Sequence, residues 1–153
     1  MKAYADTSFL GSLFIHDDHH DVAAAYMQEH EPEVWFTPLS GAELQNAFFR
    51  RVFNQRQGKA NASTLDEAKA AWSMVEDYVA KRVLAENTPD WPRVCERARA
   101  LTERHTPVLG NRTLDVLQVA SALVSGAKLF LSFDDRQRTI AKAEGLAVGP
   151  GIQ

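Results

Sequence analysis

The chain has 153 residues, of which 45% are hydrophobic and 24% charged, as in a single globular domain with its own core. Its one cysteine, Cys95, excludes an intramolecular disulfide and a cysteine-based metal cage, and it favours a reducing compartment such as the cytoplasm. The first apolar run, residues 9–15, is too short to cross a membrane, and no basic segment precedes it as in a signal peptide. We therefore predict one cytoplasmic domain over residues 1–153, with no membrane partner.

The predicted elements alternate between strands and helices. In the first half of the chain we expect a strand at 2–5, helices at 9–14 and 21–30, a strand at 34–37, and helices from 39 to about 55 and at 64–79. In the second half we expect a strand at 82–85, a helix at 92–105, a loop at 106–112, a helix at 113–124 capped by Thr113, a strand at 128–132, a helix from about 135 to 144, and a strand at 146–148. This alternation predicts an α/β domain with a mostly parallel sheet.

The net charge of −3 is unevenly distributed. Residues 1–49 hold one basic and eight acidic residues, a balance of −7, whereas residues 50–153 hold sixteen basic and twelve acidic residues, a balance of +4. This pattern suits a cation-binding centre flanked by a surface that contacts phosphates. It suits a chance asymmetry of solvated helices equally well, so charge alone does not decide the function.

Four acidic residues stand where strands end or helices begin: Asp6, Glu43, Asp115 and Asp134. In an open parallel sheet this is the edge where ligands bind. Each residue taken alone is more simply explained as a helix cap, since carboxylates satisfy the free N–H groups there. Ser40 and Glu43 have the spacing of a capping box, and Asp134 with Gln137 nearly so. The spacing does not show that the four carboxylates meet.

Carboxylates that do meet need a compensating charge. Two of them about 4 Å apart repel by roughly 4 kcal/mol at an effective dielectric constant of 20, so four together need shared protons or bound cations. Oxygen ligands of high charge favour Mg²⁺ or Mn²⁺ over Zn²⁺. Such a site binds one or two ions that polarise a phosphoryl oxygen and activate water for in-line attack.

Four segments together resemble the PIN-domain family and, within it, the VapC-type toxin ribonucleases of VapBC toxin–antitoxin pairs. They are YADTSFL at 4–10, SGAEL at 40–44, RTLDVLQVASA at 112–122 and FLSFDDR at 130–136. Their order, their spacing and the total length all match that family. The resemblance implies a three-layer α/β/α fold with a mostly parallel central sheet, and the activity of a metal-dependent endoribonuclease.

The resemblance also implies roles for individual residues. It gathers Asp6, Glu43, Asp115 and Asp134 into one pocket that binds Mg²⁺ or Mn²⁺. Three hydroxyl residues are then expected to orient ligands or water: Thr7, Ser8 and Ser132. The chain departs from the family at Asp135, where a basic residue is common and a helix-start role is expected, and at Gln118, where relatives often carry histidine.

The implied partners are an RNA substrate, a cognate antitoxin protein and a second copy of the chain. Arg50, Arg112 and Arg136 are candidates for RNA phosphate contacts, with surface charge or ion pairing as the alternative for each. The helix containing Phe48, Phe49, Val52 and Phe53 has more apolar surface than one buried face needs, which indicates a partner surface. The segment 16–21, HDDHHD, is better interpreted as a solvated turn than as a zinc site.

Three other functions compete with the ribonuclease. A small Mg²⁺-dependent phosphatase would also use an Asp after the first strand, but it usually has a second Asp two residues later, where this chain has Ser8. A receiver-like signalling domain would carry its acidic pair near the first strand, whereas Asp134 and Asp135 come late. A catalytically silent RNA-binding PIN domain would not need all four acidic positions.

Overall fold

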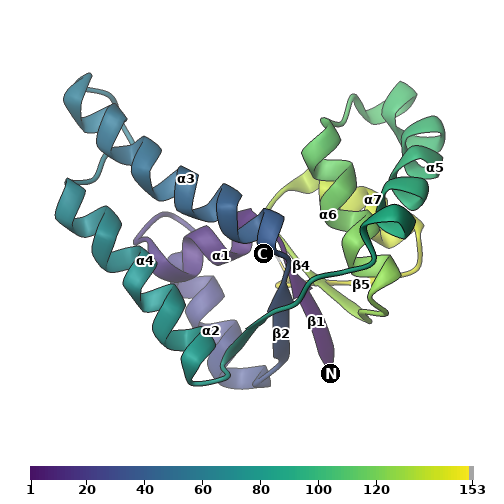
Figure 1. Cartoon of the computed structure of the whole chain (residues 1–153), viewed down its shortest axis with the longest axis horizontal. Coiled ribbons are helices and arrows are strands. Elements are labelled where there is room, and N and C mark those ends of the chain that lie inside the picture. Colours follow the sequence, from purple (N-terminus) through teal and green to yellow (C-terminus); the bar gives the residue numbers. More distant parts are fainter. Residues whose placement is uncertain (152–153) are drawn as a thin grey trace.

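A computed structural model describes residues 1–151. Its centre is a five-stranded, wholly parallel sheet in the order β3-β2-β1-β4-β5 (Figure 1). The strands are β1 (Lys2–Ala5), β2 (Glu33–Phe36), β3 (Leu84–Glu86), β4 (Leu129–Leu131) and β5 (Ala147–Gly149). The chain therefore adds β2 and then β3 on one side of β1, and afterwards adds β4 and then β5 on the other side. This reversal lies between β1 and β4 and is where an open sheet offers a crevice for a ligand.

Helices cover both faces of the sheet (Figure 1). On one face lie α1 (Thr7–Phe14), α2 (His20–His30), α3 (Pro38–Arg56) and α4 (Leu65–Ala80). On the other face lie α5 (Trp91–Leu109), α6 (Thr113–Val124) and α7 (Asp135–Ala143). No helix within residues 1–151 has the length and apolar character needed to span a membrane.

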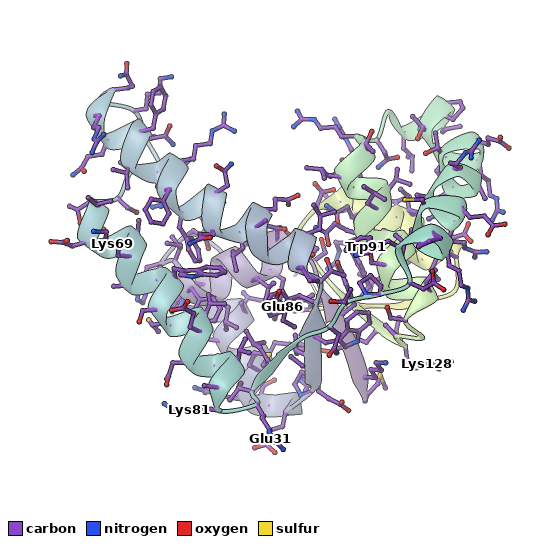
Figure 2. All side chains as sticks on the ribbon, viewed as in Figure 1. Glu31, Lys69, Lys81, Glu86, Trp91 and Lys128 are labelled. Carbon is purple, nitrogen blue, oxygen red and sulfur yellow. The ribbon has the colours of Figure 1, made fainter. Side chains whose placement is uncertain are left out.

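Alternation along the strands divides the core in two. In β1, the side chains of Ala3 and Ala5 pack with α1–α4, whereas Tyr4 packs with α5–α7. Trp35 of β2 and Phe130 of β4 join Tyr4, with ring centroids 4.9 Å and 5.8 Å from its ring. Side chains fill the space between the sheet and both helical layers (Figure 2). The expected three-layer α/β/α architecture is confirmed.

The predicted loop at 106–112 is wrong over most of its length, because α5 continues to Leu109 with Pro107 inside it. A proline in the last turn removes only one helical hydrogen bond, and the carbonyl group that loses it belongs to the exposed Glu103. The helix ends at Gly110, whose φ of 63° lies in the left-handed region that glycine adopts freely. Its N–H donates to the Thr106 carbonyl at 2.9 Å.

Two capping predictions are also corrected. The helix α3 begins at Pro38, and its cap is Thr37, whose hydroxyl accepts the Ser40 N–H, so Ser40 and Glu43 do not form a capping box. The N-cap of α6 is Arg112 rather than Thr113. Asp115 accepts the backbone N–H of Arg112 at 3.1 Å and so supplies the capping interaction.

A buried carboxylate joins α7 to α5. The side chain of Glu144 is 5% exposed and contacts Arg97 at 3.0 Å, Arg104 at 2.6 Å and His105 at 2.8 Å. Burial by itself raises the pKa of Glu144, but the bond from His105 and the charges of the two arginines together lower it below its usual value. A lowered pKa means that the folded state stabilises the carboxylate form.

Replacing Glu144→Gln is therefore expected to destabilise the domain by about 1–3 kcal/mol at pH 7, because charge-assisted hydrogen bonds are lost. The stabilisation by Glu144 is present above the usual carboxylate pKa and disappears as the pH falls through the lowered pKa. Thermal melting should show a gap between wild type and variant at pH 7 that closes in acid. Glu103→Gln, at an exposed position of α5, is the matched control. A difference in melting temperature between wild type and Glu144→Gln that does not change with pH would contradict a stabilising role of the Glu144 carboxylate.

Candidate active site at the carboxyl edge of the sheet

Asp6 stands at the reversal of the sheet, directly after β1. Its backbone N–H donates to the Leu131 carbonyl of β4 at 3.0 Å, which fixes it between the two central strands. Its side chain caps α1 by accepting the Phe9 N–H at 2.9 Å. The residue is fully buried, at 0% exposure. A carboxylate that ends a strand and caps a helix is fixed in place before any ligand binds.

Burial raises the pKa of Asp6 to about 6. The hydrogen bonds from Phe9, Ser8 and Ser132 oppose this rise, and the nearby charge of Asp134 adds to it. The ionised side chain is therefore destabilised by its burial, and a bound cation would stabilise it.

Two serine hydroxyls connect the ends of β1 and β4. The Ser8 hydroxyl donates to Asp6 at 2.7 Å and accepts the Phe133 N–H at 2.9 Å. The Ser132 hydroxyl donates to Asp6 at 2.8 Å and accepts the Asp134 N–H at 2.9 Å. Both residues thus hold Asp6 and shape the turn that carries Asp134. These are the contacts expected of residues that orient an acidic ligand.

Asp134 and Asp115 are joined through one glutamine. Asp134 caps α7 by accepting the N–H groups of Arg136 and Gln137 at 2.9 Å and 3.0 Å. The Gln137 side-chain amide donates to Asp115 at 3.2 Å. Gln137 is buried, at 7% exposure, and Asp115 is half-buried, so this bridge between α6 and α7 is partly shielded from water. Sequence reasoning noticed Gln137 only by its spacing from Asp134 and missed its contact with Asp115.

A hollow of about 400 Å³ opens beside these carboxylates. It is lined by Arg112, Asp115, Phe133, Asp134, Asp135 and Arg136. Two of the three arginines predicted to contact phosphate therefore reach the acidic edge, whereas Arg50 is exposed on α3 and is not among the residues of this hollow. The guanidinium groups of Arg112 and Arg136 beside three carboxylates suit a ligand that carries both phosphate and a cation.

No hydrogen bond joins Glu43 to Asp6, Asp115 or Asp134 within residues 1–151. It lies in the second turn of α3, and one of its oxygens, Oε2, is buried with no hydrogen-bond partner among the described residues. Buried polar atoms are normally paired, so this oxygen is available to a ligand. A further carboxylate, Glu86, ends β3 at the same edge (Figure 2). Its Oε2 would lie 3.9 Å from a Cβ at Gly41.

A network of buried hydrogen bonds connects the sheet core to Thr7. The Tyr4 hydroxyl donates to the Gln118 side-chain carbonyl, which also accepts the Ser40 hydroxyl at 2.8 Å. The Gln118 amide then donates to Thr7 Oγ1 at 3.3 Å. Gln118 therefore spans from the sheet core to the first helix of the site. Burial raises the pKa of the Tyr4 phenol well above its usual range, which keeps it a donor.

The donor set fits a hard divalent cation by its chemistry. All candidate ligands are carboxylate oxygens, Asp6 is a buried anion, and Oε2 of Glu43 is unpaired. Among residues 1–151, however, no three acidic, histidine or cysteine side chains are grouped as an ion-binding set in the structure as it stands. Mg²⁺ does not require such a set, because it keeps several water ligands and needs only one or two carboxylates. Asp6 and Asp134 would supply these two.

The comparisons with known proteins match this architecture. The fold is similar to that of the VapC20 toxin of Mycobacterium tuberculosis, described as cleaving the sarcin-ricin loop, with a TM-score of 0.67, 19% identity and coverage of 97% of this chain and 99% of that one. FitAcB of Neisseria gonorrhoeae follows with a TM-score of 0.60, 15% identity and coverage of 97% and 96%.

VapBC2 of Rickettsia felis, described as bound to a DNA fragment from their promoter, has a TM-score of 0.58 and 12% identity, with coverage of 97% and 98%. No curated protein matches the sequence. At these identities the structural similarities establish the fold. The PIN domain model matches residues 3–143, nearly the whole length, and the acidic edge lies within that span. The chain belongs to the PIN domain family.

Proposed function

We propose that this protein is a metal-dependent endoribonuclease, the toxin of a toxin–antitoxin pair. The observation that carries the proposal is the fully buried carboxylate of Asp6 at the reversal of the sheet, with Asp134 close enough to raise its pKa. The family, the fold shared with VapC20 and the phosphate-binding character of Arg112 and Arg136 support the same function.

In this proposal Asp6 and Asp134 hold Mg²⁺ or Mn²⁺, with Asp115 completing the site directly or through water. The ion supplies Lewis-acid stabilisation of charge on the scissile phosphate. Ser8 and Ser132 keep Asp6 oriented through the hydrogen bonds described above. The unpaired oxygen of Glu43 completes the cluster or accepts a hydrogen bond from the attacking water.

Arg112 and Arg136 bind the phosphates on either side of the cleaved bond, since both line the hollow that contains Asp115 and Asp134. Water attacks the phosphorus and the bond to the 3′ oxygen breaks, which leaves a 5′-phosphate and a 3′-hydroxyl. The RNA 2′-hydroxyl is not the nucleophile in this scheme. Mapping of the 5′ ends of cleaved cellular RNA after brief expression identifies both the substrate and the end chemistry.

Cleavage of purified RNA tests the function. We expect cutting with Mn²⁺ or Mg²⁺, none with EDTA, and none by Asp134→Asn, which retains the capping geometry of the side chain. Release of inorganic phosphate from small phosphate esters without RNA cleavage would favour the phosphatase alternative. RNA binding without cleavage under all metal conditions would favour a silent PIN domain.

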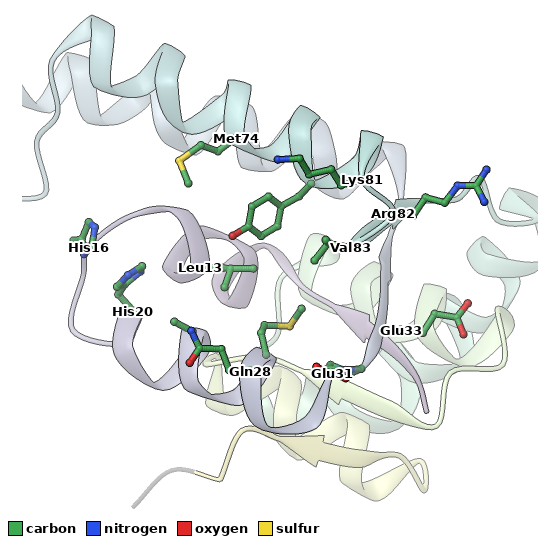
Figure 3. A pocket seen from close by; sticks show the side chains of 14 residues that line it. Leu13, His16, His20, Gln28, Glu31, Glu33, Met74, Lys81, Arg82 and Val83 are labelled. Atoms are coloured by element: carbon green, nitrogen blue, oxygen red, sulfur yellow. The ribbon is translucent and has the colours of Figure 1, made fainter.

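We further propose that a cognate antitoxin binds in a groove of about 840 Å³ between α2 and α4. Leu13, Met74 and Val83 point into this groove, and Tyr78 and Met27 also line it (Figure 3). Met74 and Val83 are 47% and 40% exposed, so apolar surface is left for a partner segment. The VapBC2 structure of this fold supports the choice of an antitoxin as the partner.

The variant Met74→Glu is expected to weaken antitoxin binding at least about tenfold, because it places a charge in the apolar groove. Met74→Leu keeps the volume and should bind within about twofold. Calorimetric titration of both variants with the cognate antitoxin, to be sought among small proteins encoded beside this gene, measures the two affinities. Equal affinity for wild type and Met74→Glu would place the antitoxin elsewhere.

We also propose a homodimer. Phe49 and Phe53 of α3 are 37% and 54% exposed, although Phe48 and Val52 of the same helix are buried. Two exposed aromatic rings one turn apart provide an apolar surface for a second copy. Light scattering of wild type and Phe53→Arg measures the oligomeric state.

A further inference from the structure

A column of three aromatic rings leads from the core to the surface beside the acidic edge. Phe9 is fully buried, and its ring centroid lies 5.8 Å from that of Phe133 with an interplanar angle of 21°. Phe133 stacks in turn on His19, with centroids 4.3 Å apart and an angle of 7°. His19 is exposed. The column therefore ends in a flat ring with one face on Phe133 and the other toward solvent.

Hydrogen bonds hold the backbone of the two residues that carry the outer rings. The Phe133 N–H donates to Ser8, which also holds Asp6. The His19 N–H donates to Asp17 at 2.9 Å, and Asp17 accepts the Ser12 hydroxyl at 2.9 Å. His19 occupies the N-cap of α2, yet its side chain makes no capping hydrogen bond. The imidazole therefore stacks on Phe133 and does not cap the helix, which is what the side chain of an N-cap residue usually does.

The charges around the column differ on its two sides. His19 and Phe133 line a hollow of about 500 Å³ together with Arg51 and two acidic residues, Asp17 and Asp134, the second of which is a proposed metal ligand. They also line a second hollow of about 700 Å³, which contains Asp18, Asp21 and Glu29 and would repel phosphate. An RNA strand would accordingly approach from the first side, where Arg51 and the candidate metal site lie.

We propose that the exposed face of His19 is the stacking platform for a nucleobase of single-stranded RNA next to the cleaved phosphate. This inference rests on the proposed ribonuclease function and adds a base-binding position to it. A stacked base extends the column Phe9–Phe133–His19 by one ring and fixes the adjoining phosphate beside Asp134. Stacking accepts any base, since every base has a π-face, so the platform contributes affinity rather than sequence readout.

Single-turnover cleavage of a short single-stranded RNA with saturating Mn²⁺ tests the platform. His19→Ala is expected to raise the half-saturating protein concentration about 5- to 150-fold, the range that loss of one stacked base produces. The maximal rate should change much less than this, because His19 contacts none of the proposed metal ligands. His19→Phe retains a flat ring and should bind within about twofold of wild type. His19→Lys carries a charge without a ring and should behave like His19→Ala.

The matched control is His30→Ala, which removes a stacked histidine at the end of α2, 4.2 Å from the Tyr26 ring; His30 lines the acidic second hollow and not the one that contains Asp134. It should leave the half-saturating concentration unchanged. Full activity of His19→Ala, or rescue by His19→Lys and not by His19→Phe, would overturn the platform while the ribonuclease stands. Failure of the wild type to cut RNA with Mn²⁺ would instead remove the proposed function, and the platform with it.

Discussion

Asp6→Asn is expected to abolish RNA cleavage and, at neutral pH, to make the protein free of metal more stable. Asparagine can still accept the Phe9 N–H, so the cap of α1 is kept. The pKa of Asp6 is raised from 3.8 to about 6, so ionisation of this buried group destabilises the folded state. A shift of this size corresponds to about 3 kcal/mol, which the variant would recover.

The pH dependence of stability distinguishes this account from a simple loss of a side chain. Because the pKa of Asp6 is raised in the folded state, ionisation of Asp6 costs the folded protein nothing below pH 3.8, the pKa in the unfolded chain. The free energy of unfolding then falls as the pH rises through about 6. Thermal melting from pH 4 to 8 should therefore show wild type falling relative to Asp6→Asn and the difference levelling above about pH 7.

Addition of Mn²⁺ should raise the Tm of the wild type alone, because only it retains the buried anion. A variant that still cuts RNA, or that melts in parallel with wild type across the whole pH range, contradicts the role given to Asp6.

Gln137→Leu is expected to weaken Mn²⁺ binding and cleavage by about 10- to 100-fold, the usual effect of losing a residue that orients a metal ligand. The substitution removes the hydrogen bond to Asp115 and leaves the backbone contact with Asp134 in place. Gln137→Glu should be at least as damaging near neutral pH, since it sets a carboxylate beside that of Asp115.

A control variant on α7 separates loss of ligand positioning by Gln137 from a general loss of protein stability. Ile140 is fully buried on α7, and Ile140→Val should cost about 0.5–1.5 kcal/mol of stability. That variant should keep the Mn²⁺ affinity of the wild type, because it leaves every hydrogen bond of the site unchanged. Equal Mn²⁺ affinities for Gln137→Leu and Ile140→Val in calorimetric titration would show that Gln137 has no positioning role.

Much of the fold was predictable because its signals are local. The strands at 2–5 and 128–132 are short apolar runs, and the helices that follow them begin at carboxylates that cap them. Pro107 was misjudged because a proline reliably ends a helix only when it falls in one of the central turns, whereas Pro107 falls in the last turn of α5. In the last turn its missing N–H affects a single solvent-facing carbonyl.

The candidate site was predictable only in part. Three of the four acidic residues serve as helix caps, as their positions suggested, and the parallel order of the sheet brings these caps to one edge. Glu43 was misjudged as a capping residue because α3 begins at Pro38, two residues before Ser40, and its cap is Thr37. Contacts between distant segments, such as Gln137 with Asp115 and His19 with Phe133, leave no periodic or spacing signal in one sequence.

The central claim is that Asp6 and Asp134 share a divalent cation. A crystal grown with Mn²⁺, with diffraction recorded at the manganese absorption edge, tests it most directly. We expect an anomalous peak in coordination contact with the carboxylates of Asp6 and Asp134, and no such peak in crystals of Asp6→Asn. Manganese found only at His16 and His20, whose rings lie 4.0 Å apart, or at no ordered position, would contradict the account.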